Sequence, residues 1–381
     1  MPPRVSRRRL LRWWGALPWS SLALAAGEDL VPFIDYTREF RTEAQASNPR
    51  VKCYDLRQLT AWATPPEEFF VFHQTETMRA DAGRWRLRIG GFVERPAEFS
   101  LEDLLRRPDR RDVAVTLECS GNSGSPRFMN GLVSNAVWTG VSLANVLREC
   151  GVKPEAREVV FFGMDVEEDA ERTSPHGRSI HVQDALAPEG MLAFAMNGQP
   201  LPAEQGFPLR LILPGWYGMA QVKWLTRIEV LDRRYEGRQM ARNYHSLRAV
   251  ETPEGTFWMD TSISRNNLKS VLARVTRGRV GERFEYKLAG AAWGGAAKIE
   301  KVEVQIDGGQ WRPARIDERR GDYAWLLWSY DWKGAATGRH ILVSRAINAR
   351  GEVQPTRDEW RKKLASNRED NAQWPRPVLI G

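Results

Sequence analysis

The chain has 381 residues, of which 42% are hydrophobic and 27% charged, a balance typical of a folded protein and unlike that of a disordered one. The net charge of +8 includes five arginines and no acid within residues 1–26, so the rest carries only +3, scattered among acids. That distribution excludes a phosphate-tracking surface and hence a nucleic-acid partner. Three cysteines without a CxxC pair or a CxxCH motif exclude a disulfide framework and predict no c-type haem on this chain.

The first segment, residues 1–26, predicts an export signal. Arginines at positions 7–9 precede a short apolar stretch, 13–26, that ends in small residues. The paired arginines resemble a twin-arginine signal, which exports folded proteins and would place the chain in the periplasm. A basic tail or an uncleaved anchor is the alternative. No other stretch reaches the roughly 18 apolar residues of a membrane helix, so we expect no span in the mature chain.

Residues 27–260 predict a mixed α+β domain. Segment 27–66 is loop-rich and is expected to pack as an arm on this domain. Strand patterns follow at 85–89, 113–117, 159–162, 191–196, 209–213 and 221–231. Ser100 and Ser142 are N-cap residues for short helices at 101–105 and 143–150, and Gly151 ends the second.

After about residue 260 the pattern changes to short, evenly spaced strands with glycine turns. These lie at 283–288, 299–306, 323–332 and 340–347, and no convincing helix interrupts them. Residues 261–381 therefore predict an immunoglobulin-like β-sandwich. The sandwich is dense in tryptophan, which favours a role in a homodimer, although a mere packing partner is the alternative; the tryptophans are Trp293, Trp311, Trp325, Trp328 and Trp332.

The most unusual segment is LECSGNSG at 117–124, which places Cys119 at the end of a buried strand, in a loop of small residues. A thiolate there suits a transition metal. Taken alone, the pattern favours a buried structural cysteine instead.

Further segments favour the interpretation of Cys119 as a metal ligand. They are AVWTGVSL at 136–143, FFGMD at 161–165, AMNGQPLP at 195–202, GFPLRL at 206–211 and VKWL at 222–225, followed by Ala292-Trp293, IDGG at 306–309 and Ala324-Trp325. In this order and spacing, from about residue 60 to the end, the chain resembles the sulfite oxidase family of molybdopterin-dependent oxidoreductases. The resemblance implies the sulfite oxidase fold, with a molybdopterin-binding domain followed by an immunoglobulin-like dimerisation domain.

The resemblance also implies a site. Cys119 would be the ligand to molybdenum and Tyr244 an active-site residue near the metal. The residues expected to bind the pterin and its phosphate are Phe72, His73, Asp165, Gln205, Arg210, Gln221, Val222 and Lys223. Backbone groups of the segment from Gln221 to Lys223 would contribute to this binding. Arginine and lysine suit a buried phosphate dianion. The alternative for the charged residues is a structural salt bridge, and for Tyr244 a core aromatic. His176 and His181 fall in a polar segment taken as a loop, which favours solvated side chains over a role at the pocket; His245 is close enough in sequence to Tyr244 to reach the site.

Three positions depart from the family pattern. The arginines that surround sulfite in the family are replaced by Phe72, Gly124 and Leu326. Each charge-assisted hydrogen bond lost is worth about 1.5–3 kcal/mol, so a less anionic substrate is expected. Arg127, His73 and Arg178 are the cations that could compensate.

The functional prediction is oxygen-atom transfer on a small oxo-anion or S-oxide, with electrons passed to an external carrier such as a c-type cytochrome. Sulfite dehydrogenase-like activity is the default. The alternatives are an S-oxide or N-oxide reductase, and a secreted binding module that has lost its pterin.

Overall fold

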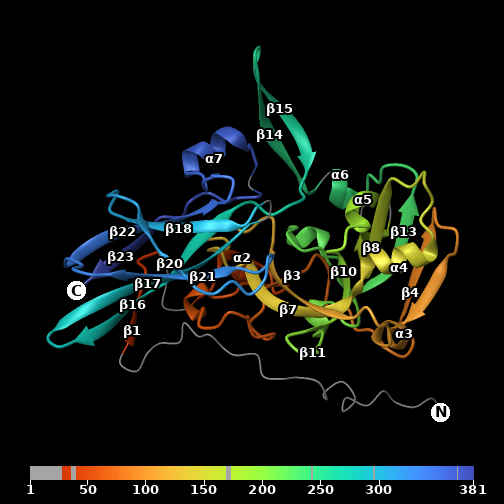
Figure 1. The fold of residues 1–381 in the computed structure, drawn as a ribbon, viewed down its shortest axis with the longest axis horizontal. Helices are drawn as coiled ribbons and strands as arrows, with labels where there is room; N and C mark the ends of the chain where they lie inside the picture. The colour runs from red at the N-terminus through yellow and green to blue at the C-terminus, as the bar shows by residue number, and fades with distance from the viewer. Residues whose placement is uncertain (1–27, 36–39, 169–172, 242, 295–296, 367) are drawn as a thin grey trace.

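The computed structural model describes residues 28–35, 40–168, 173–241, 243–294, 297–366 and 368–381. The predicted export signal lies outside these residues. Two parts lie side by side along the long axis: a mixed α+β part and a β-sandwich (Figure 1). No helix in the described ranges is long and apolar enough to cross a membrane.

The α+β part contains two sheets. The first has the order β5-β4-β13-β8-β9, with bounds Ala97–Ser100, Arg86–Gly91, Leu225–Leu231, Glu158–Glu168 and Thr173–His181. The second has the order β11-β10-β7-β6, with bounds Gln199–Pro200, Met191–Met196, Val133–Ser142 and Arg111–Glu118, and β12 (Arg210–Ile212) also pairs with β10. Apolar side chains from both sheets and from α4 fill one buried cluster.

Short helices connect these strands. The predicted helices are confirmed: α3 (Leu101–Leu105) begins with a capping box at Ser100, and α4 (Leu143–Cys150) begins at Ser142 and ends at Gly151, whose φ is 69°. The remaining short elements of this part are α2 (Glu43–Ser47), α5 (Val182–Ala185), α6 (Arg238–Ala241), η1 (Leu56–Gln58), η2 (Ala203–Gln205), η3 (Gly218–Ala220), β2 (Val51–Lys52) and β3 (Val71–Phe72). The expected loop around His176 and His181 is instead strand β9, which pairs with β8.

The sandwich is built from a five-stranded and a four-stranded sheet, as predicted. The five-stranded sheet has the order β1-β16-β17-β21-β20, with bounds Glu28–Val31, Lys269–Val280, Arg283–Trp293, Leu326–Trp332 and Arg315–Ile316. The other has the order β19-β18-β22-β23, with bounds Arg312–Pro313, Ile299–Ile306, Gly338–Asn348 and Arg376–Ile380. The expectation that no helix occurs here is wrong, since α7 (Arg357–Lys363) begins with a capping box at Thr356.

One further expectation needs correction. The segment 27–66 does not pack only on the α+β part, because β1 pairs antiparallel with β16 of the sandwich. Of the five tryptophans, those at 293, 325, 328 and 332 are buried in the sandwich's own core and Trp311 is half-buried; this packing does not test the expected homodimer.

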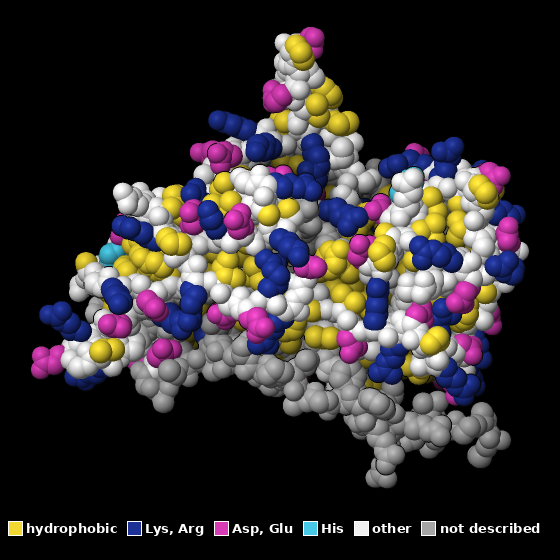
Figure 2. All heavy atoms as spheres, in the orientation of Figure 1, with side chains coloured by type: hydrophobic (Ala, Val, Ile, Leu, Met, Phe, Trp, Pro, Cys, Tyr) yellow, Lys and Arg dark blue, Asp and Glu magenta, His cyan; other side chains and the backbone are white. Residues whose placement is uncertain are grey.

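Between the two parts, β14 (His245–Thr252) and β15 (Gly255–Ser262) form a hairpin that projects from the body of the molecule (Figure 1). Strand β15 carries the exposed apolar side chains Phe257, Trp258 and Met259. Hydrophobic atoms are seen along the projection (Figure 2).

Candidate functional site

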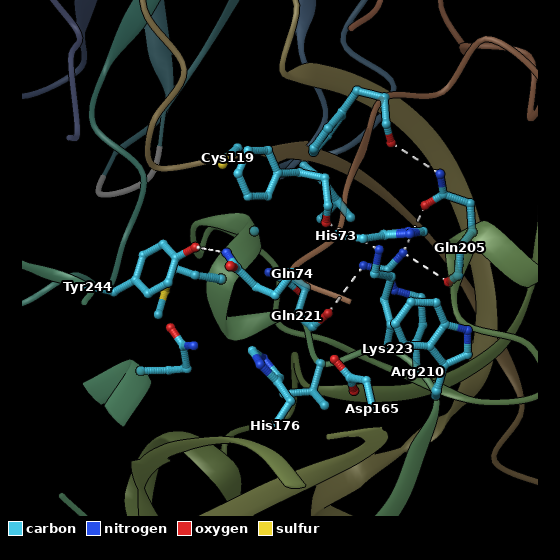
Figure 3. A pocket seen from close by; sticks show the side chains of 18 of the residues that line it. His73, Gln74, Cys119, Asp165, His176, Gln205, Arg210, Gln221, Lys223 and Tyr244 are labelled. Atoms are coloured by element: carbon cyan, nitrogen blue, oxygen red, sulfur yellow. Dashed lines mark hydrogen bonds between the residues drawn. The ribbon is translucent and has the colours of Figure 1, made fainter. Parts of the chain in front are cut away.

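A pocket of about 100 Å³ opens between the Cys119 loop, β3, β8 and the segment after η3. All ten residues predicted for the site line it, so sequence positions from 72 to 244 converge at one place (Figure 3). The residues are Phe72, His73, Cys119, Asp165, Gln205, Arg210, Gln221, Val222, Lys223 and Tyr244. Their individual roles stay predictions.

Cys119 follows the last residue of β6, and its half-buried thiol faces the pocket. The loop is fixed by backbone bonds, with Cys119 N donating to Leu132 O at 3.0 Å and Asn122 N donating to Cys119 O at 2.9 Å. Burial raises the pKa of the thiol, so a positive charge or a metal is needed to hold the thiolate. The geometry therefore favours a ligand over a reactive free thiol.

Residues of the sandwich hold Glu118, the residue before Cys119, in place. The buried carboxylate of Glu118 accepts from Lys269 Nζ at 3.0 Å and from Trp293 Nε1 at 2.8 Å, and Asn122 Nδ2 donates to it at 3.0 Å. Lys269 also donates to Asp370 O at 2.7 Å. Because Lys269 begins β16 and Trp293 ends β17, the second part of the chain positions the metal-ligand candidate of the first.

Arg210, at the start of β12, is a buried cation held by neutral groups. Its guanidinium donates to Gln205 O and Oε1, both at 3.1 Å, and to Gln221 O at 3.3 Å, and it lies over the Trp138 ring at 4.8 Å. Burial lowers its pKa to about 9. Its Nε has no hydrogen-bond partner among the described residues, so this cation lacks a counterion.

The two amides next to Arg210 have structural partners. Gln205 Nε2 donates to Phe70 O at 3.1 Å. Gln221 exchanges bonds with the backbone of Leu213, at 2.6 and 2.7 Å, and also donates to Trp216 O. These two amides fix the backbone around Arg210. They therefore have a positioning role besides their predicted contact with the cofactor.

Lys223 lies beside Arg210 at the same end of the pocket (Figure 3). Its ammonium group donates to Phe72 O at 3.4 Å and Glu204 O at 3.3 Å and lies 4.8 Å from the Trp224 ring centroid. Burial, together with the charge of Arg210, places its pKa well below the usual value. The same two effects, burial first and then the charge of Lys223, lower the pKa of His73 to about 4.

Strand β8 extends beyond the predicted 159–162, and Asp165 lies within it, at a register shift between Phe162 and Val166. The irregularity turns its buried carboxyl toward the pocket. Gly163 allows this, because a Cβ there would lie 2.2 Å from Asp165 Oδ1 and 2.9 Å from Lys223 O.

Tyr244 lies on the side of the pocket opposite Arg210 and Lys223 (Figure 3). Its buried hydroxyl accepts a 3.0 Å hydrogen bond from Gln74 Nε2, and burial raises its pKa to about 12, so it carries a proton at neutral pH. The phenol is therefore able to donate a hydrogen bond into the pocket.

Sequence reasoning missed several lining residues. His176 lines the pocket and is not fully solvated, contrary to the preferred interpretation, and Gln239 from α6 and Trp224 also line it. A strand prediction for residues 173–181, paired with β8, would have been the signal that His176 is part of the site. By contrast, His245 bonds Asp260 at 2.6 Å within the hairpin and does not line the pocket, so the interpretation that it reaches the site is wrong.

The three replaced positions carry uncharged residues in different surroundings. Phe72 packs edge-on against Phe128; Gly124 abuts the Trp374 indole, where a Cβ would lie 2.5 Å from Cδ1; and Leu326 is buried in the sandwich. Of the three expected substitutes, Arg178 is buried against the carbonyls of Gln239 and Ile263.

Arg127 is exposed beside Phe128, outside the pocket lining. His73 does line the pocket but is neutral at pH 7, since its pKa is about 4. The compensation expected from these side chains is therefore not seen.

These residues fit a metal–pterin cofactor. Within the described ranges, no three His, Cys, Asp or Glu side chains gather to hold a metal ion by themselves, so the single soft thiol of Cys119 suits a metal that arrives with its own sulfur ligands. Arg210 and Lys223 are buried cations for which the described residues supply no carboxylate within hydrogen-bonding distance, an arrangement that suits a buried phosphate.

Comparison with known proteins agrees with this geometry. The family described as "Oxidoreductase molybdopterin binding domain" matches residues 73–239, and the "Mo-co oxidoreductase dimerisation domain" matches 260–368. The sulfane dehydrogenase SoxCD from Paracoccus pantotrophus aligns with a TM-score of 0.74 at 27% identity, covering 92% of this chain and 91% of that one.

Curated relatives give the same picture. Sulfite oxidase from Gallus gallus is 30% identical over 314 residues, which cover 77% of this chain and 68% of the relative. The mitochondrial sulfite oxidase of Homo sapiens is 31% identical over 318 residues, and the chain spans 57% of it. Nitrate reductase [NADH] 2 of Arabidopsis thaliana is 30% identical, with 36% of its length covered. The chain belongs to the sulfite oxidase family of molybdopterin-dependent oxidoreductases.

Proposed function

We propose that this chain is an oxidoreductase that moves an oxygen atom to or from a small sulfur compound at a molybdenum–pterin held by Cys119. The observation that carries the proposal is the pairing, in one pocket, of a soft thiol with two buried cations that have no carboxylate partner among the described residues. When bound, the cofactor would supply the redox change and accept or release the oxygen atom.

The chain's own residues would bind and orient. Arg210 and Lys223 neutralise the phosphate, and Gln205 and Gln221 hold the Arg210 guanidinium in place. The apolar side chains of Phe72, Met219 and Val222 exclude water from the lining between them. The protonated Tyr244 hydroxyl, fixed by Gln74, offers a hydrogen bond to an oxygen atom near the metal.

The substrate we propose is less anionic than the dianion expected for the family's sulfite-binding members. The support is the loss of three cations at positions that Phe72, Gly124 and Leu326 occupy. Sulfite remains the reference substrate for assays. Micromolar saturation with fast turnover of sulfite would contradict this part of the proposal.

Elemental analysis with pterin extraction tests the core of the proposal. Protein from a molybdate-fed host is expected to hold about one molybdenum per chain, and the Cys119→Ser variant much less redox-active metal. Cys150→Ser, at a buried thiol away from the pocket, is the matched control. A metal-free wild type would overturn the proposal and favour a secreted binding module.

A reductase acting on an S-oxide or N-oxide is the second candidate, favoured by the weakly cationic pocket. The two are separated by incubating the holo-protein with each compound. Reduction of the metal by sulfite supports the dehydrogenase, and reoxidation of the metal by an S-oxide supports the reductase.

Export, assembly and electron transfer complete the proposal. The arginine-rich leader supports twin-arginine export to the periplasm, tested by locating the protein after replacement of Arg8 and Arg9 by lysine. The match to a dimerisation domain supports a homodimer, tested by light scattering. A separate carrier, such as a c-type cytochrome, would take the electrons, tested by reduction of cytochrome c.

A further inference from the structure

The hairpin of β14 and β15 projects from the molecule as a two-stranded sheet with apolar side chains on both faces (Figure 1). Because side chains alternate along a strand, Phe257 and Met259 lie on one face and Trp258 on the other. Each of the three is 45–48% exposed. A two-stranded sheet alone in water is at best marginally stable, so this hairpin has the features of an arm that binds a partner.

The base of this arm is fixed to the body of the molecule. Ala365 N donates to Leu247 O at 3.0 Å, so the segment after α7 covers the lower part of the β14 edge. Arg248 of β14 forms an ion pair with the buried Glu369 at 2.6 Å. A partner would therefore meet an arm that is already ordered, which lowers the entropic cost of binding.

The outer edge of β15 is open. In the part of the chain that the structure describes, the backbone of residues 255–262 pairs only with β14. Proteins protect an exposed edge with lysine, proline or a bulge. The sequence of β15, GTFWMDTS, has neither lysine nor proline, and its pairing with β14 has no register shift. This edge is therefore suited to accept a further strand.

The residues along this edge are complementary to a second copy of themselves. With a two-fold axis at Trp258, antiparallel pairing of two β15 strands sets Phe257 of each copy opposite Met259 of the other. The apolar residues then meet one another, and the charged Asp260 lies opposite Thr256, outside the apolar centre. Such aromatic and apolar cross-strand pairs stabilise a sheet.

The two ends of the arm carry opposite charges. Exposed Glu251 and Glu254 lie at the free end, where acidic side chains are seen, and basic side chains surround the base (Figure 2). The base adjoins α7, whose last turn carries the exposed Arg361, Lys362 and Lys363. In the antiparallel arrangement the acidic end of each arm lies toward the basic base of the other, and the two bodies lie at opposite ends of the new sheet.

We infer that the outer edge of β15 is a docking surface for a second copy of this chain, so that two arms join into a four-stranded antiparallel sheet. The segment that matches a dimerisation domain begins at Asp260, inside β15, and is therefore continuous with this edge. The inference rests on the homodimer that is part of the proposed function and not on the oxygen-transfer chemistry.

The first test measures the dimer dissociation constant of the purified full chain by analytical ultracentrifugation. Trp258→Lys would set two ammonium groups opposite each other at the two-fold axis, so the constant is expected to rise about tenfold or more. Phe284→Lys is the matched control, because Phe284 lies on β17, is 46% exposed and gains the same charge. The control is expected to keep the wild-type constant.

A charge exchange shows whether two copies meet at this residue. Trp258→Glu alone should weaken the dimer as Trp258→Lys does, whereas an equal mixture of the two variants should form a heterodimer, since opposite charges then face each other. Trp258→Cys should also give a cross-linked dimer on mild oxidation, because directly opposite Cα atoms of antiparallel strands are about 4.5–5.5 Å apart. Phe284→Cys should give none.

A monomeric wild type would overturn the inference. So would a dimer whose dissociation constant is the same in wild type and Trp258→Lys, which would place the interface on another surface of the sandwich. Loss of binding to cytochrome c or to anionic phospholipid vesicles in Trp258→Lys, with the dimer intact, would also overturn it and favour that partner. Molybdenum content is expected to be equal in all these variants, and a metal-free wild type would contradict the proposed chemistry while the dimer measurement still stands.

Discussion

At the scale of single residues, the pocket is characterised by two buried cations that a bound anion would neutralise. Arg210 and Lys223 lose hydration without gaining a carboxylate from the part of the chain that the structure describes, which is costly for folding unless an anion binds. The two cations are therefore placed to bind an anionic ligand and do not stabilise the cofactor-free fold.

The Arg210→Gln variant is expected to separate these effects. Cofactor-free variant protein should be at least as stable as wild type, since a buried cation is removed, while pterin content should fall at least tenfold, because charge-assisted bonds worth about 1.5–3 kcal/mol each are lost. Thermal unfolding and pterin extraction measure the two. Arg227→Gln, at a largely exposed arginine, is the control. Full pterin retention in Arg210→Gln would contradict the phosphate assignment.

His73 predicts a pH dependence of the cofactor-free protein. The folded pKa is about 4, below the usual 6.5, so the unfolded chain takes up a proton first as the pH falls. The free energy of unfolding should be insensitive to His73 above pH 6.5 and should fall by ~1–3 kcal/mol between pH 6.5 and 4. Denaturant unfolding across this range is the measurement. His73→Gln should flatten the slope; an unchanged slope in this variant would refute the assignment.

Sequence reasoning found ten of the lining residues because motifs of the family mark them. It did not find Arg368, whose guanidinium carbon lies 4.4 Å from the Tyr244 ring centroid, since this contact depends on how the segment after α7 folds back over the Cys119 loop. It also limited the strand to 159–162 and did not foresee that β8 continues past Asp165, because a register shift inside a strand leaves no local pattern.

At the scale of elements, β8 shows how a strand can both pair and present a ligand. Its N-terminal half pairs with β13 and β9, while the shift after Phe162 turns Asp165 inward. Helix starts were predictable from Ser100 and Ser142, since capping is local chemistry. The start of α7 carried the same signal in Thr356 and Glu359, which was overlooked among the strands.

Gly163→Ala is expected to disturb this arrangement. The added Cβ would meet Asp165 Oδ1 at 2.2 Å and Lys223 O at 2.9 Å, so the carboxyl must move. We expect a loss of about 1–3 kcal/mol of stability and reduced pterin content. Denaturant unfolding and pterin analysis measure this. Gly90→Ala, where a Cβ meets Glu229 at an ordinary 3.5 Å, is the matched control. Equal stability and pterin content in the two variants would show that β8 tolerates the added methyl group at position 163.

At the scale of the whole molecule, both domains were predictable from periodicity, but their connection was not. The ion pair of Glu118 and Lys269 joins residues 151 positions apart, and such a pairing depends on tertiary packing that no local pattern records. The crossing of β1 into the sandwich is a similar case.

The Lys269→Met variant tests the connection. Removing the cation leaves a buried carboxylate unpaired, which should cost about 3–5 kcal/mol, whereas the double variant with Glu118→Gln should recover much of this. Unfolding in denaturant gives the coupling energy, with Lys298→Met, at an exposed pair, as the control. Additive losses in the double variant would mean that the two side chains do not interact.

This ion pair also determines how the chain can be divided. A fragment that stops ahead of the sandwich would retain Glu118 but lack both Lys269 and Trp293, so the carboxylate of the residue before Cys119 would lose two of the partners that fix it. Such a truncation should fail to assemble a metal centre even though it would retain every pocket-lining side chain. In engineering terms, the sandwich would be part of the scaffold of the proposed metal site, so we expect that it cannot be exchanged as an independent module.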